Sequence, residues 1–156
     1  MCGLFGIISP SPVSPSDLAA LARHAQQRGR DSSGLLLHKN DAYRVHRADY
    51  RVTQLLSEVS LEKSTFVAGH SRLITNGLGD NQPVVRDSVC VLHNGIVVND
   101  SAVWPTTGKR RELQIDTEVI AALAAAHLEA GRPVKALAEG ILSACRGVVE
   151  IGRAHV

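Results

Sequence analysis

The chain opens with an apolar run, residues 2–8, whose sequence is Cys-Gly-Leu-Phe-Gly-Ile-Ile. A run of this length, apolar at nearly every position, is typical of a buried strand. The proline-rich stretch that follows, residues 9–16, ends the run, because proline cannot donate to a strand ladder. The sequence therefore predicts a buried strand that begins almost at the amino terminus.

Further segments have the patterns of strands and helices. Strands are predicted over 33–38 and 42–48, which we expect to pair as a hairpin, and over 64–73 and 88–98. Helices are predicted from a cap at Ser16 or Asp17 to Gln27, over 52–59, over 117–130, and from Pro133 to Cys145. The stretches 75–85 and 99–116 are predicted loops. Strands in clusters with helices on either side indicate two sheets sandwiched between helical layers.

Composition excludes several functional classes. Aromatic residues make up only 3% of the 156 residues, so the core is expected to consist of Leu, Val, Ile and Ala. A net charge of +2 is too small to indicate binding to nucleic acid, and no apolar stretch approaches the length of a membrane span. The three cysteines, Cys2, Cys90 and Cys145, are widely spaced. This pattern fits a reducing cytoplasm and offers neither a disulfide framework nor a metal site.

Cys2 is the first candidate for chemistry. Removal of Met1 would give Cys2 a free α-amine, which has an ordinary pKa near neutral pH and is a suitable base for the cysteine's own thiol. The alternative is that Cys2 is a small apolar residue in a strand, since free cysteine is commonly buried.

Three more segments contain candidate residues, each with a structural alternative. Arg72, at the end of an apolar strand, offers a fork of donors for a carboxylate, or else is a solvated arginine. Asn94 and Gly95 lie inside an apolar run, where an amide and a backbone N–H can form an oxyanion hole, although Asn-Gly also favours a hairpin turn. Asp116 begins the helix 117–130, where a carboxylate often serves only as a cap.

The order of these segments resembles that of the class II glutamine amidotransferases, which are N-terminal-nucleophile hydrolases. The matching blocks are MCGLFG, QRGRDSSG near residue 30, GHSRLITNG near 70, QPVV, LHNGIVVN near 95 and DTEVI near 118. They cover residues 2 to about 123 in unbroken order. The resemblance implies an α+β fold, a four-layer α/β/β/α sandwich, and hydrolysis of L-glutamine to glutamate and ammonia through a thioester on Cys2, without a cofactor or metal.

The resemblance also implies a role for each matching residue. Cys2 would be the nucleophile, and Asn94 with Gly95 the oxyanion hole. Arg72 would bind the α-carboxylate of glutamine and Asp116 its α-ammonium. Thr75 would lie near the bound amino acid, and Arg28 would order the site. His93 is expected to support its loop rather than to act as a base, because the α-amine already fills that role.

The family delivers its ammonia to a synthase domain, which is absent from this sequence. HNGIVVN and DTEV match the sugar-phosphate branch, whereas QPVV is closer to other branches. Ile96 departs from the acidic residue of the asparagine branch, and Leu73 departs from the aromatic residue of the sugar-phosphate branch. A sugar phosphate is the acceptor that we favour. Homo-oligomerisation is left open.

We expect residues 2–150 to be an incomplete glutaminase domain, truncated at its carboxyl terminus. The final residues, 151–156, resemble translated adapter DNA, which predicts a non-native tail. Two alternatives to an active glutaminase remain. One is a catalytically inactive domain of the same fold that binds glutamine or regulates a partner, and the other is a different N-terminal-nucleophile amidase.

Overall fold

The computed structural model describes residues 2–74 and 79–153. The chain divides into two compact units. The first contains residues 1–75 and 81–83, and the second contains residues 76–80 and 84–156. Each unit has its own sheet, its own helices and its own hydrophobic core.

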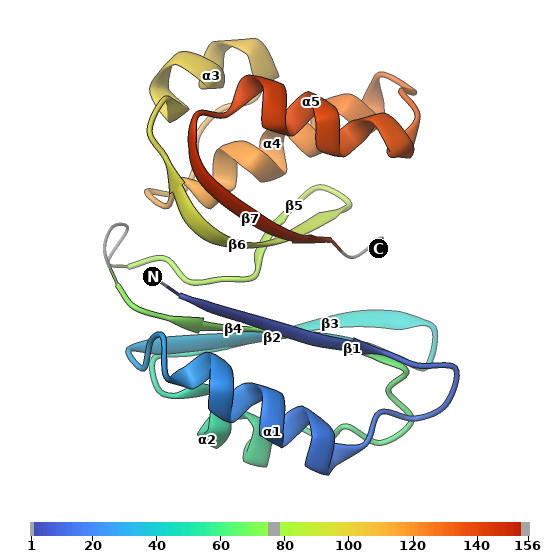
Figure 1. The fold of residues 1–156 in the computed structure, drawn as a ribbon. Helices are drawn as coiled ribbons and strands as arrows, with labels where there is room; N and C mark the ends of the chain where they lie inside the picture. The colour runs from blue at the N-terminus through green and yellow to red at the C-terminus, as the bar shows by residue number, and fades with distance from the viewer. Residues whose placement is uncertain (1, 75–78, 154–156) are drawn as a thin grey trace. The chain divides into compact units, whose positions relative to one another are not determined.

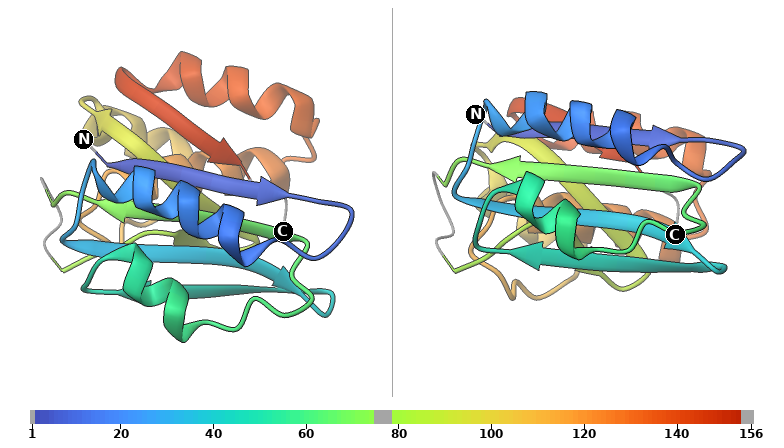
Figure 2. Two further views of the ribbon diagram at one scale, coloured as in Figure 1. Left: turned by 60° about the horizontal axis from the view of Figure 1, so that its bottom comes forward. Right: turned by 90° about the horizontal axis from the view of Figure 1, so that it is seen from below.

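The first unit is a four-stranded antiparallel sheet covered by two helices. The strand order is β1 (Gly3–Ile8), β4 (Phe66–Arg72), β2 (Ser32–Lys39) and β3 (Ala42–Ala48). Helices α1 (Pro15–Gln26) and α2 (Val52–Glu58) lie against the same face of this sheet (Figures 1 and 2). The opposite face is referred to below as the helix-free face of the first sheet.

Alternation along the strands determines which side chains enter the core of the first unit. Leu35 and Leu37 of β2 and Val67 of β4 pack with residues of α1 and α2, whereas their neighbours in sequence point to the helix-free face. Gly3 brings β1 close to α1, since a Cβ at Gly3 would lie 2.3 Å from the carbonyl oxygen of Ala25. Position 3 therefore has no room for a side chain.

The second unit has a three-stranded antiparallel sheet with helices on one side (Figure 1). The strand order is β5 (Val84–Arg86), β6 (Val89–Val97) and β7 (Gly147–Arg153). The helices are α3 (Asp100–Thr107), α4 (Thr117–Glu129) and α5 (Leu137–Ala144), and a 3-10 turn, Val134–Ala136, leads into α5. Gly131, with a φ of 66°, follows the end of α4.

Helix α4 forms the centre of the second core. Its alanine-rich sequence lets it approach the sheet and the other helices closely, and eight of its thirteen residues are buried. Val91 and Val97 of β6 contact this core, so the odd-numbered residues of β6 face α4. The even-numbered residues, Asn94 among them, lie on the sheet face that turns away from α4.

The α+β class expected from the sequence is confirmed, as are most of the predicted elements. One capping prediction is wrong: Ser14, not Ser16 or Asp17, caps α1 and accepts a hydrogen bond from the N–H of Asp17. Three elements were not predicted: β5 and α3, which occupy predicted loops, and β7, which follows Cys145. Among the described residues, no helix is both long and apolar enough to cross a membrane.

Candidate active site

Cys2 lies directly before β1, at the end of the strand that pairs with β4. The pairing of Gly3 with Ser71 brings the start of β1 beside the end of β4. The Cys2 sulfur lies 3.6 Å from the carbonyl oxygen of Leu73, and the side chain is half-buried. A thiol that lies just outside the strand and retains some exposure is accessible to a ligand. The alternative of Cys2 as a buried residue within a strand does not hold, because β1 begins at Gly3.

Arg72 is the last residue of β4 and is only 3% exposed. This burial excludes the alternative of a solvated arginine. Val67 faces the helices, so Arg72, five positions further on, lies on the helix-free face of the first sheet. The strand pairing and the contact of Cys2 with Leu73 therefore bring the predicted nucleophile and the predicted carboxylate-binding arginine to one end of this sheet.

The loop after α1 is tied to the end of β4 by several hydrogen bonds. Ser71 donates through its hydroxyl to the carbonyl of Gly29 at 2.7 Å, and the N–H of Asp31 donates to the carbonyl of Arg72 at 2.9 Å. The Asp31 carboxylate in turn accepts the N–H of Ile74 at 2.8 Å. A Cβ at Gly29 would lie 2.4 Å from the Arg72 carbonyl carbon, so glycine is needed there. These contacts fix the backbone around Arg72.

Arg28 precedes Gly29 and is exposed, and its N–H donates to the carbonyl of Ala25 at the end of α1. The next residue, Gly29, is the one that closely approaches the backbone of Arg72. Thr75, the other predicted substrate-binding residue of this unit, lies outside the described residues.

Asn94 and Gly95 lie within β6, in a strand that continues from Val89 to Val97. This position excludes the hairpin turn that Asn-Gly favours by local rules. Asn94 is 3% exposed and lies on the face of β6 that turns away from α4. Gly95 has a φ of 155°, and a Cβ there would lie 1.8 Å from the carbonyl oxygen of Val148 in β7. Only glycine fits beside Asn94.

Asp116 lies at the N-cap position of α4, is 7% exposed, and is tied to β6 instead of capping its helix. Its Oδ2 accepts the N–H of Val97 at 2.8 Å. The carboxylate is thereby held two residues beyond Gly95 along β6. In the second unit, the predicted oxyanion pair therefore lies within β6, and the predicted ammonium-binding acid is hydrogen-bonded to the same strand.

His93 faces α4, where its Nδ1 lies 3.4 Å from the hydroxyl of Thr117. Burial lowers the pKa of His93 below its usual value, and the negative charge of Asp116 opposes this effect only in part. The imidazole is therefore neutral near pH 7, and it links β6 to the first turn of α4.

Three charged residues of the second unit were not identified from the sequence. Asp80 and Glu118 bind the backbone that leads to Asp116, and Arg86 binds the carboxylate of Glu118, through contacts given below. Single charged residues in a loop, in a short strand or in a first helical turn have no distinctive spacing. In the described part of the chain, no cluster of three or more His, Cys, Asp or Glu side chains is placed to hold a metal ion.

Comparisons with known proteins find relatives in sequence and a solved structure with a similar fold. No family model matches the chain. The glutamine--fructose-6-phosphate aminotransferase of Brucella abortus is 33% identical over 146 residues, which cover 88% of this chain and 24% of that protein. The enzyme of the same name from Mesorhizobium japonicum is 34% identical over 146 residues, again covering 24% of its length. The chain thus spans about a quarter of the length of these relatives.

A solved structure shows the same fold. The glutamine phosphoribosylpyrophosphate amidotransferase of B. subtilis, complexed with ADP and GMP, superimposes with a TM-score of 0.75. The match is 24% identical and covers 96% of this chain and 34% of the amidotransferase chain. From its relatives in sequence, we conclude that the chain belongs to the class II, N-terminal-nucleophile glutamine amidotransferases.

Proposed function

We propose that the chain hydrolyses the side-chain amide of L-glutamine, with Cys2 as nucleophile after removal of Met1. The observation that carries this proposal is the pairing of β1 with β4, because it puts a half-buried thiol next to the buried Arg72. A guanidinium held in this way is suited to the α-carboxylate of an amino acid, and a thiol at residue 2 is suited to attack its side-chain amide.

In the proposed reaction, the Cys2 sulfur attacks the amide carbon, and the α-amine of Cys2 accepts the thiol proton. The carbonyl oxygen becomes an oxyanion, which the Asn94 amide and the Gly95 N–H stabilise. The protonated amine then gives its proton to the departing ammonia, leaving a γ-glutamyl thioester. Attack by water on the thioester releases glutamate and restores the thiol.

The remaining assignments concern binding. Arg72 would hold the α-carboxylate, and Asp116 would hold the α-ammonium through its Oδ1, since Oδ2 is engaged with Val97. Thr75 and Arg28 are proposed to order the site around the substrate. For the rest of the chain we propose an incomplete glutaminase domain over residues 2–150 and a non-native tail over residues 151–156. The cytoplasm is the proposed compartment.

The direct test compares the wild-type chain with Cys2→Ala. Wild-type protein is expected to release equal amounts of glutamate and ammonia from glutamine, whereas Cys2→Ala is expected to bind glutamine without turnover. Isothermal titration measures binding, and enzymatic detection of glutamate measures turnover. Wild-type protein that binds glutamine but never hydrolyses it would instead establish the inactive binding domain.

We further propose that the ammonia serves a synthase domain that acts on a sugar phosphate. The support is that the relatives more than 30% identical are named for fructose 6-phosphate, whereas the amidotransferase that acts on phosphoribosylpyrophosphate is 24% identical. A longer gene product that contains both domains should consume glutamine when fructose 6-phosphate is added. Consumption driven by phosphoribosylpyrophosphate alone would refute this choice of acceptor.

A further inference from the structure

The four residues directly before Asp116 have their backbone N–H groups bound by two carboxylates. Glu118 accepts the N–H of Glu112, at 3.1 and 3.2 Å to its two oxygens, and the N–H of Leu113 at 2.8 Å. Asp80 accepts the N–H groups of the next two residues, Gln114 and Ile115, through its Oδ2. The segment 112–115 has no helix or strand of its own, so these contacts determine its path.

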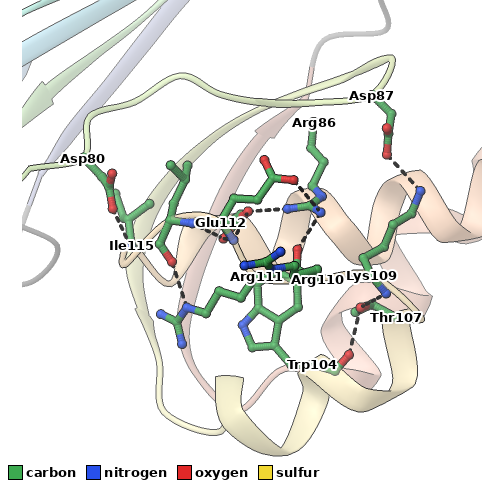
Figure 3. Close-up of polar contacts among 12 residues, drawn as sticks. Asp80, Arg86, Asp87, Trp104, Thr107, Lys109, Arg110, Arg111, Glu112 and Ile115 are labelled. Atoms are coloured by element: carbon green, nitrogen blue, oxygen red, sulfur yellow. Dashed lines mark hydrogen bonds and ion pairs between the residues drawn. The ribbon is translucent and has the colours of Figure 1, made fainter.

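Glu118 is the buried one of these two carboxylates. Its side chain is 2% exposed and forms an ion pair with Arg86 of β5, whose own side chain is 10% exposed. Arg86 also donates to the carbonyl of Arg110 at 2.6 Å and lies over the ring of Trp104, 5.8 Å from its centroid (Figure 3). These contacts are expected to stabilise the unit as a whole, because removing one partner of a buried ion pair leaves an uncompensated buried charge.

Asp80 is the second of the two carboxylates, and it differs from Glu118 in its burial and in its place in the fold. It is only half-buried, it belongs to the loop before β5, and Figure 3 shows its side chain reaching Ile115. The bond to Ile115 is 3.2 Å long and ends one residue before Asp116. The Asp116 carboxylate is held separately, by the N–H of Val97. The backbone entering Asp116 and the tip of its side chain are thus fixed by different elements.

We propose that Asp80 is a positioning residue for Asp116, and through it a determinant of selectivity for amides that carry an α-ammonium group. This inference rests on the proposed function, in which Asp116 binds that group. Without Asp80, the N–H groups of Gln114 and Ile115 lose a charged acceptor. The backbone that carries Asp116 can then shift relative to the Val97 N–H that holds its carboxylate. The reacting thiol and the oxyanion hole are not touched by this change.

An interaction made equally in the ground state and the transition state raises KM when it is lost and leaves kcat unchanged. The predicted effect of Asp80→Ala is therefore a higher KM for glutamine. Because the bond between Asp116 and the α-ammonium is weakened in this variant, a rise in KM of about tenfold is expected. Glutaramate, the analogue of glutamine without the α-amino group, should be hydrolysed equally well by both proteins.

The experiment measures kcat and KM of the wild-type chain for glutamine and for glutaramate, and repeats this with three variants. Asp80→Ala should lower the preference for glutamine over glutaramate about tenfold, the change that a loss of roughly 1.4 kcal/mol produces. Asp80→Asn keeps an oxygen acceptor and should restore most of the preference. Asp87→Ala is the control, since the Asp87 carboxylate binds Lys109 and not the segment 112–115.

A double substitution separates positioning from a general loss of stability. Asp116→Ala alone should remove the preference for glutamine, and Asp80→Ala should cause no further loss in that background. Thermal unfolding checks that each variant is folded, and Asp80→Leu, whose side chain branches at Cγ as that of aspartate does, replaces Asp80→Ala if that variant unfolds.

The possible results separate the two proposals. Wild-type protein that is folded but hydrolyses neither amide would overturn the proposed function, and with it this inference. Wild-type protein that hydrolyses glutamine, with an Asp80→Ala variant that loses activity equally on both amides or on neither, would overturn the positioning role alone.

Discussion

At the scale of single residues, the proposed reaction depends most on the amide of Asn94. This side chain is buried on the face of β6 that turns away from α4. Loss of one oxyanion donor typically costs roughly 10²–10³ in rate, so we expect Asn94→Ala to slow glutamine hydrolysis by about that factor while the protein stays folded. Ile96→Ala is the matched control, because Ile96 lies on the same face, two residues away and 49% exposed. Equal turnover by wild-type protein and Asn94→Ala would remove Asn94 from the mechanism.

The low pKa of His93 has a consequence for stability. Burial keeps the folded imidazole neutral, whereas the unfolded chain takes up a proton below a pH of about 6.5. In that range the unfolded state binds more protons, so the free energy of unfolding should decrease as the pH falls from 7.5 to 5.5. Urea titrations should show a smaller decrease for His93→Gln. An identical pH dependence in both proteins would show that His93 does not titrate in this way.

The three thiols should differ in reactivity. Cys2 is half-buried, whereas Cys90 and Cys145 are 6% and 8% exposed. Burial, followed by the negative charge of Asp116, raises the pKa of Cys145 and so suppresses its thiolate. Brief treatment of the native protein with iodoacetamide near pH 7.5 should therefore modify Cys2 alone. Peptide mapping that finds Cys145 modified as fast as Cys2 would contradict this expectation.

At the scale of elements, Glu112 in the segment before α4 and Glu118 in the first turn of α4 both pair with Arg86. These two glutamates can therefore be compared directly. Arg86 pairs with the buried Glu118 and, at 3.4 Å, with Glu112, whose side chain is 69% exposed. Breaking a buried pair typically costs about 3–5 kcal/mol, whereas an exposed pair is worth about 1 kcal/mol or less. Glu118→Gln should therefore lower the free energy of unfolding far more than Glu112→Gln does. Similar losses in chemical denaturation would contradict the assigned role of Glu118.

The elements found from the sequence are those with long apolar periodicity, such as β4, β6 and α4. The missed ones lack it. Strand β5 has three residues directly after Pro83, and α3 contains Pro105 and two threonines at its end, so neither segment has the pattern of its element. Ser14, rather than its neighbours, caps α1 because Pro15 occupies the first helical position. Such choices depend on local geometry that composition does not encode.

At the scale of the whole molecule, the sequence motifs predicted the family, and the structure describes the surroundings of each candidate within its unit. The order of six short blocks was sufficient to identify Cys2, Arg72 and Asn94 as candidates. The contacts of Asp80 and Glu118 with residues 112–115 could not be predicted, since they depend on how a loop folds back on a helix. Patterns in sequence locate reactive groups more readily than the residues that orient them.

The central claim is that Cys2 is the nucleophile for glutamine, and intact-mass spectrometry after treatment with 6-diazo-5-oxo-L-norleucine tests it most directly. This glutamine analogue alkylates nucleophiles of this kind. The account predicts a protein that has lost Met1 and carries one adduct on Cys2, with labelling blocked by excess glutamine and absent in Cys2→Ser. A folded protein without an adduct, or with its adduct on Cys90 or Cys145, would contradict the account.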